Sequence, residues 1–81
     1  DIVLYNNNAQ PVMIVECKSV KVKITQDVFN QIARYNMKLR VPFLVVTNGL
    51  QHYCCQMDYG KKSFKFIPEI PVYESIKDLQ D

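Results

Sequence analysis

The chain lacks any long run of apolar residues. Stretches such as 12–15 and 43–46 hold only four apolar residues each, whereas a helix that spans a membrane needs about 18. The sequence also lacks internal repeats, low-complexity segments and linkers, so residues 1–81 are expected to form one domain. A domain this small buries a modest fraction of its surface, and its first residue is Asp1, not Met. We therefore expect a single domain that is incomplete at its N-terminus and has no membrane segment.

Cysteine and histidine are scarce. Cys17, Cys54 and Cys55 form no C-x-x-C pair and His52 is the single histidine, so we expect no structural zinc site. Cys54 and Cys55 are neighbours, and on a strand their side chains would point to opposite faces. His52 is expected on a sheet surface. This cysteine usage predicts a reduced, cytoplasmic chain.

An excess of one charge sign is also missing, because the net charge is only +2. Its distribution is uneven: residues 1–40 hold six basic and three acidic residues, and residues 41–81 hold four basic and five acidic residues. A phosphate partner is therefore expected on the N-terminal half. Lys21, Lys23 and Arg34 are the candidate nucleic-acid contacts, to the phosphate backbone and not to bases. The alternative for the lysines is an ordinary solvated loop.

A β-hairpin is predicted at the start of the chain. The β-prone residues 2–5 and 11–17 flank a polar, turn-forming segment at 6–10. Residues 12–15 are apolar at consecutive positions, which indicates a strand buried on both faces in the middle of a sheet. Pro11 can open this strand because a first residue tolerates the missing N–H.

A helix and a second buried strand are predicted next. Thr25 or Asp27 can cap the start of the helix, and Pro42 prevents its continuation. Residues 43–47 form the next strand, so strand, helix and strand make a parallel, right-handed crossover. The expected apolar stripe of the helix holds Val28, Ile32, Tyr35 and Leu39, with Phe29, Ala33 and Met37 adjoining it.

The rest of the chain predicts a second hairpin, formed by residues 50–57 and 63–67 at the sheet edge. Residues 74–79 predict a short terminal helix. The expected fold class is therefore α/β, with a small mixed sheet crossed by one main helix.

Counting across the first hairpin places two carboxylates together. If Tyr5 faces Val12 and the pairs between them follow in order, Asp1 faces Glu16. Directly opposed residues have Cβ atoms about 4.5–5.5 Å apart. Lys18 lies on the same face as Glu16, because side chains alternate along a strand. Asp1, Glu16 and Lys18 are therefore expected to converge.

Two neighbouring carboxylates need a counterion, because their charges repel each other. Oxygen ligands from Asp1 and Glu16, with the backbone carbonyl of Cys17, suit Mg²⁺ or Mn²⁺. Such an ion could polarise a phosphate and acidify a water, while the Lys18 ammonium orients that water or neutralises developing charge. The sequence thus predicts a metal centre at this end of the hairpin.

Two polar-tipped side chains accompany this cluster. Gln31 and Tyr35 are separated by four positions and share one helix face. Both can form hydrogen bonds towards a neighbouring site. Tyr35 also fits the apolar stripe, so a core position is the alternative for it.

The combination resembles a known nuclease family. Asp1, then Glu16-Cys17-Lys18, then Gln31 with Tyr35, resembles the PD-(D/E)XK nuclease superfamily, in the branch that carries a Q-x-x-x-Y helix. The wider pattern is similar to the N-terminal nuclease domain of type I restriction enzyme R subunits. That similarity covers roughly residues 1–57 and rests on segments 1–5, 11–18, 31–35 and 41–49.

The resemblance implies a restriction-endonuclease-like fold and metal-dependent hydrolysis of DNA phosphodiester bonds. It implies Asp1 and Glu16 as metal ligands, Lys18 as the catalytic lysine, and Gln31 and Tyr35 as residues that support the site or contact the substrate. The implied cofactor is Mg²⁺ or Mn²⁺. DNA is the implied partner, with other restriction-system subunits or further copies of this chain as additional candidates.

Two alternatives from other classes stay open at this point. An isolated E-x-K is often a solvated charge pair on an amphipathic strand. The chain would then be a nucleic-acid-binding module that does not cut DNA, or an assembly module with the same fold. The order of the motifs along the predicted hairpin and helix favours the nuclease.

Overall fold

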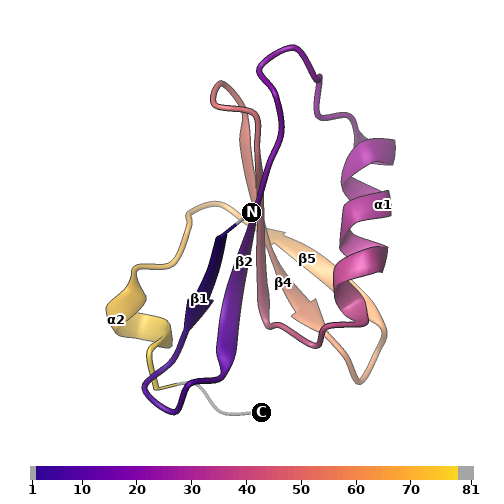
Figure 1. Cartoon of the computed structure of the whole chain (residues 1–81). Coiled ribbons are helices and arrows are strands. Elements are labelled where there is room, and N and C mark those ends of the chain that lie inside the picture. The colour runs from indigo at the N-terminus through magenta and orange to yellow at the C-terminus, as the bar shows by residue number, and fades with distance from the viewer. Residues whose placement is uncertain (1, 79–81) are drawn as a thin grey trace.

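The structure, a computed structural model, describes residues 2–78 as a five-stranded sheet with two helices (Figure 1). The strands are β1 (Ile2–Tyr5), β2 (Pro11–Cys17), β3 (Phe43–Thr47), β4 (His52–Asp58) and β5 (Ser63–Ile67), and the helices are α1 (Gln26–Met37) and α2 (Tyr73–Ile76). The strands follow chain order across the sheet, β2 is parallel to β3, and the other pairs are antiparallel. The predicted mixed α/β sheet with a strand–helix–strand crossover is confirmed. Neither helix of this segment is long and apolar enough to cross a membrane.

The two faces of the sheet carry separate hydrophobic clusters, with α1 and α2 on opposite sides (Figure 1). Neighbouring residues of a strand point to opposite faces. The α1 side therefore buries Ile14, Leu44, Val46, Cys55 and Met57 against Phe29, Ile32 and Ala33. The α2 side buries Met13, Phe43, Val45 and Cys54 against Ile76. This confirms that β2 is buried on both faces and that Cys54 and Cys55 point apart.

The β1–β2 hairpin has the predicted register over most of its length. Three predicted pairs are present: Ile2 with Val15, Val3 with Ile14 and Leu4 with Met13. The predicted pairing of Tyr5 with Val12 is wrong, because the register shifts after Leu4 and Tyr5 faces Pro11. Val12 is thus an extra residue in β2, as in a β-bulge. The bulge explains why Val12 and its neighbour Met13 both belong to the α2-side cluster.

Helix α1 begins where the sequence predicts. The Oγ1 of Thr25 accepts a hydrogen bond from the backbone N–H of Val28 (3.2 Å), which satisfies one of the open donors at the helix start. The capping residue is therefore Thr25 and not Asp27. The ring centroids of Phe29 and Phe66 lie 4.8 Å apart. This contact anchors the N-terminal half of the helix on β5.

The buried face of α1 covers part of the predicted apolar face, since Phe29, Ile32 and Ala33 are buried. Tyr35 is 67% exposed and Leu39 is 51% exposed, so the stripe is wrong at these two positions and the alternative of a core position for Tyr35 is excluded. The helix instead buries Asn36, whose side-chain N–H donates to the backbone oxygen of Ile32 (2.9 Å). This bond removes the cost of burying the amide, and the inward face therefore includes a polar residue that an apolar pattern does not count.

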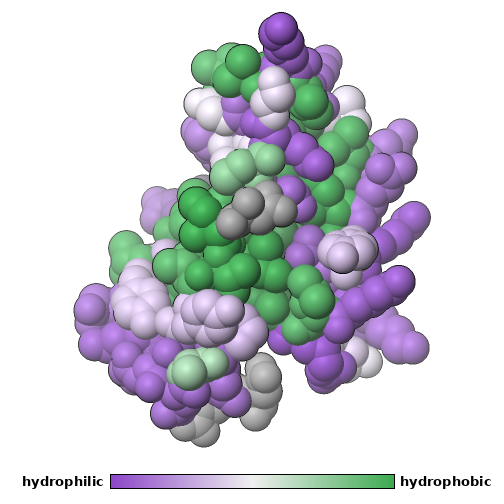
Figure 2. Space-filling view, viewed as in Figure 1, coloured by the Kyte–Doolittle hydropathy of each residue, from purple (hydrophilic) through white to green (hydrophobic). Residues whose placement is uncertain are grey.

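In the view of Figure 2, hydrophobic side chains fill the middle of the surface, hydrophilic ones gather at the lower end and lower right, and the upper end is mixed. Strand β1 contributes to the apolar part, since Ile2 is 54% exposed and Val3 is 42% exposed. Because β1 forms one edge of the sheet, these side chains are covered less than those of the central strands.

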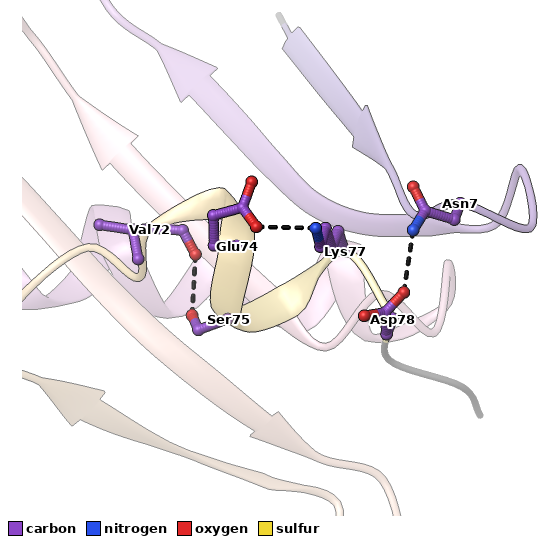
Figure 3. A network of polar contacts seen from close by, with 6 residues as sticks. All are labelled: Asn7, Val72, Glu74, Ser75, Lys77 and Asp78. Carbon is purple, nitrogen blue, oxygen red and sulfur yellow. Dashed lines mark hydrogen bonds and ion pairs between the residues drawn. The ribbon is translucent and has the colours of Figure 1, made fainter.

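The short helix α2 is held against the β1–β2 turn by polar contacts (Figure 3). The backbone N–H of Asn7 donates to the Lys77 oxygen (2.8 Å), and its side-chain N–H donates to an Asp78 carboxylate oxygen (2.9 Å). The Tyr73 hydroxyl donates to the backbone oxygen of Tyr5 (2.6 Å). The predicted terminal helix at 74–79 is confirmed in part, because α2 begins at Tyr73 and ends at Ile76, and residue 79 lies outside the described residues.

We expect the three thiols to differ in reactivity. Cys17 is exposed, whereas Cys54 and Cys55 are buried. Burial raises the pKa of the Cys54 thiol, and burial with the neighbouring Cys54 charge raises the pKa of Cys55 to about 12. A raised pKa keeps a thiol protonated, and the protonated form is the unreactive one. With Ellman's reagent at pH 8, one thiol per chain should react quickly and the other two only on unfolding. Fast reaction of all three without denaturant would contradict this burial, and Cys17→Ser should remove the fast phase.

Candidate functional site

Glu16 and Lys18 lie together at the C-terminal end of β2. Glu16 pairs with Val46 of β3, and Val46 is buried in the α1-side cluster, so the Glu16 side chain also points to the α1 side. The backbone N–H of Lys18 donates to the Thr47 oxygen (2.7 Å), which extends the strand pairing by one residue. Alternation then puts Lys18 on the same face as Glu16. Both residues are half-buried, so this part of the predicted cluster is assembled by one strand.

The third member of the cluster, Asp1, lies outside the residues that the structure describes. The described hairpin ends with Ile2 opposite Val15, which is the register from which the pairing of Asp1 with Glu16 is predicted. Within residues 2–78, no three His, Cys, Asp or Glu side chains lie together as a metal site would require. The donor chemistry at Glu16, a carboxylate with a neighbouring backbone carbonyl at Cys17, suits a hard divalent cation. The ligand set as predicted therefore depends on Asp1.

Cys17 ends β2 and pairs with Thr47. Its exposed side chain lies on the face opposite to Glu16, because the two residues are neighbours on the strand. Thr47 pairs in turn with His52 of β4, and its hydroxyl contacts the His52 ring nitrogen Nδ1. His52 therefore lies exposed on the sheet surface, as the sequence indicates.

Gln31 and Tyr35 lie one turn apart on α1 and are both exposed. Gln26 lines a pocket with Tyr53 of β4 and Phe66 of β5, so its flank of the helix faces those strands. A rotation of about 100° per residue puts Gln31 and Tyr35 away from Gln26 and outside the buried face formed by Phe29, Ile32, Ala33 and Asn36. They thus share an exposed side of α1. Within the described chain, neither side chain forms a hydrogen bond with Glu16 or Lys18.

The loop between β2 and α1 carries two of the predicted phosphate contacts. Lys21 and Lys23 are exposed, and Arg34 is exposed on the outer surface of α1. The loop follows Lys18 directly, so it begins at the end of β2 that carries Glu16. The loop that bears Lys21 and Lys23 therefore leaves the strand that bears Glu16 and Lys18, and Arg34 lies on the crossover helix α1.

Asn48 anchors this loop, a role that the sequence pattern did not reveal. It is only 5% exposed, and its side-chain N–H donates to the Val22 oxygen (2.8 Å). Its side-chain oxygen accepts from the backbone N–H groups of Leu50 (2.9 Å) and Gln51 (2.7 Å). The Asn-Gly pair marked only a turn in the sequence. The bond to Val22 depends on tertiary structure, and it joins the turn after β3 to the loop after β2.

A family model described as "Type I restriction enzyme R protein N terminus" matches residues 1–71. The match covers the whole sheet, α1 and the segment that leads to α2. No curated protein matches the chain. No solved structure matches it either.

Replacement of the loop anchor tests how the loop is held. Asn48→Ala removes the bond to Val22 and leaves two backbone donors of the turn without their partner. We expect the free energy of unfolding to fall by about 1–3 kcal/mol. Urea unfolding followed by circular dichroism measures this change. The exposed Asn8→Ala serves as control, and equal stability of the two variants would contradict an anchoring role.

A second pair of variants tests which face of α1 is outward. Tyr35→Ala alters a residue that is 67% exposed, so its unfolding free energy should stay within about 0.5 kcal/mol of wild type. Ile32→Ala removes a side chain that is 9% exposed and should cost about 2–5 kcal/mol. Thermal or urea unfolding measures both. A large loss for Tyr35→Ala would place Tyr35 in the core and exclude it as an exposed site residue.

Proposed function

Because the chain belongs to the family of type I restriction enzyme R protein N termini, we propose that it is a metal-dependent DNA endonuclease domain of the PD-(D/E)XK type. The proposal includes a restriction-endonuclease-like fold for the small mixed sheet. Its reaction is hydrolysis of a DNA phosphodiester bond by water. Its setting is a type I restriction system in the cytoplasm, with DNA and other subunits of that system as partners.

One observation carries the proposal: Glu16 and Lys18 share one face at the end of β2, and it is the face of the sheet on which the crossover helix α1 packs. The carboxylate and the ammonium come from the same strand, and the two polar-tipped side chains come from the crossover helix. A solvated charge pair on a strand needs no such helix beside it. The order E-x-K then Q-x-x-x-Y in the sequence agrees with this arrangement.

The proposed metal ion is Mg²⁺ or Mn²⁺, held by Asp1, Glu16 and the backbone carbonyl of Cys17. When bound, such an ion supplies Lewis acidity, which polarises a phosphate oxygen and lowers the pKa of a water molecule. Glu16 is suited to this role, because no lysine or arginine forms an ion pair with it within the described chain.

Lys18 has a separate task in the proposal. Its ammonium donates hydrogen bonds and carries a positive charge, so it orients the attacking water or balances the negative charge that develops on the phosphate oxygens. Its half-buried position limits its motion and the screening of its charge by water. Gln31 and Tyr35 are exposed donors that position the substrate or support the site.

Lys21, Lys23 and Arg34 complete the proposed DNA surface. Their side chains are exposed, and lysines in a loop bind the phosphate backbone without reading bases. Asn48 holds the lysine loop next to the end of β2. The proposed DNA substrate is thus bound by the loop that follows β2, the strand that bears the proposed catalytic residues.

The test is cleavage of supercoiled plasmid DNA in Mg²⁺ or Mn²⁺ by the chain and its variants. Glu16→Gln and Lys18→Ala should each lower the rate of nicking about a hundredfold or more, because each removes a charge that acts in the transition state. Glu16→Gln should also weaken Mn²⁺ binding, measured by the electron paramagnetic resonance signal of free Mn²⁺. Glu69→Gln and Lys77→Ala are the matched controls, since both residues lie in the segment after β5.

Equal nicking by wild type, Glu16→Gln and Lys18→Ala would reject the proposed site. DNA binding that weakens with salt, with no cleavage product in either metal, would instead identify a nucleic-acid-binding module that does not cut. A chain that neither binds nor cuts DNA but sediments as an oligomer would identify an assembly module.

A further inference from the structure

A second group of basic residues lies where α1 ends and β4 turns into β5. We name it the distal basic patch, and its members are Lys38, Arg40, Lys61, Lys62 and Lys65. All five are exposed. Figure 2 shows hydrophilic side chains gathered at the lower right, where the end of α1 and the β4–β5 turn lie in Figure 1.

Three contacts hold the two segments of the patch together. The backbone N–H of Met57 donates to the Pro42 oxygen (2.8 Å), and the Tyr59 hydroxyl donates to the Val41 oxygen (2.5 Å). The guanidinium of Arg40 lies over the Tyr59 ring, 4.9 Å from its centroid. The turn that bears Lys61 and Lys62 therefore lies against the segment that bears Lys38 and Arg40, although about 20 positions separate them in the sequence. Lys65 lies at the same end of the sheet, but its side chain points to the face opposite to α1, because its neighbours Phe64 and Phe66 both contact Phe29.

The patch concentrates positive charge. Segments 38–42 and 58–65 hold five basic residues and one acidic residue, a net charge of +4, whereas the whole chain carries +2. Asp58 is the acidic residue, and its carboxylate accepts from the backbone N–H of Lys61 (3.1 Å). Between residues 2 and 78 the one ion pair joins Lys77 to Glu74, so none of the five cations forms an ion pair within the described chain.

Helix energetics account for only part of the patch. Lys38 and Arg40 follow the C-terminus of α1, where positive charge offsets the helix dipole. Lys61, Lys62 and Lys65 belong to a β-hairpin that has no such dipole. The charges of the hairpin lysines therefore have no partner in the fold.

Backbone strain marks the same surface. Arg40 has φ 54° and Lys62 has φ 53°, in the left-handed region where glycine and asparagine are the usual residues. Between residues 2 and 78, Ala9 is the one further non-glycine residue with a positive φ. Long cationic side chains thus occupy two positions at which a glycine would be less strained, and such outliers concentrate at binding sites.

The patch and the proposed catalytic residues lie at opposite ends of the sheet. Val41 and Pro42 lead into β3, whose last residue, Thr47, pairs with Cys17 beside Glu16. The five residues of β3 span about 17 Å. A ligand that contacts both ends must therefore be long, and it must be negatively charged at the patch.

We propose that the distal basic patch binds the phosphate backbone of duplex DNA away from the point of cleavage. The inference rests on the proposed function in one respect, that DNA is the ligand. The patch is spread over two segments and is open to solvent, as a linear polyanion requires. Phosphate contacts of this kind supply affinity and orientation but no sequence specificity.

The test is binding of a fluorescent duplex of about 20 base pairs, long enough to reach both ends, by anisotropy over a range of salt concentrations. Lys38→Ala with Lys61→Ala should weaken binding about tenfold at low salt and reduce the slope of log K against log salt by about 2. Lys77→Ala, which removes a lysine already paired with Glu74, should bind like wild type.

Lys62→Gly separates binding from folding. It removes one charge from a left-handed position that glycine adopts without strain. The melting temperature should therefore stay equal or rise, while the salt slope falls by about 1. Loss of affinity in a variant that is at least as stable as wild type supports direct contact with phosphates.

Wild-type affinity and wild-type salt slope in both patch variants would overturn the inference. Patch-dependent binding of a labelled polyglutamate, with no effect of the variants on duplex binding, would also overturn it and assign the patch to an acidic protein. If wild type binds DNA through the patch but does not cut it, the proposed hydrolytic function is rejected and the inference about the patch stands. If Glu16-dependent cleavage occurs and the patch variants bind normally, the inference fails alone.

Discussion

The parallel pairing of β2 with β3 fixes where the candidate functional residues lie. Two parallel strands must be joined by a crossover, and the chain uses α1 for it. Their C-terminal ends therefore meet at one edge, where Cys17 faces Thr47. The segments that leave these ends are the lysine loop and the turn at Asn48, and the bond from Asn48 to Val22 joins them. The core under α1 positions Glu16 because it buries the neighbouring Ile14 and the paired Val46.

Alternation along β2 was enough to predict much of this arrangement from the sequence. The period of two places Glu16 and Lys18 on one face whatever the rest of the fold does, and consecutive apolar residues predicted a central strand. The register failed only near the turn, because a bulge at Val12 inserts one residue and shifts Tyr5 to Pro11. Since the error lies at the turn end, it does not move Ile2 from its place opposite Val15. The pairing of Asp1 with Glu16 remains a prediction.

Helical periodicity was less reliable, for a reason that Asn36 makes plain. A count of apolar residues favours Tyr35 as a core residue and ignores asparagine. The Asn36 side chain can nevertheless be buried, because its N–H donates a hydrogen bond to the Ile32 backbone oxygen. The inward face rotates accordingly and exposes Tyr35. Long-range contacts were also beyond the pattern. The contact of Arg40 with Tyr59 and that of Asn48 with Val22 join distant segments, and no local spacing encodes them.

The sheet separates the two basic surfaces by a fixed length, and that length bears on what can bind them. Strand β3 has five residues, or about 17 Å, which equals the rise of about five base pairs in duplex DNA. A duplex is stiff over about 150 base pairs, so it can lie along both ends without losing conformational freedom. A disordered acidic peptide would lose about 1–2 kcal/mol of backbone entropy for each residue fixed across the same span. A rigid polyanion is therefore the ligand that a rigid sheet with cations at both ends binds at the lowest entropic cost.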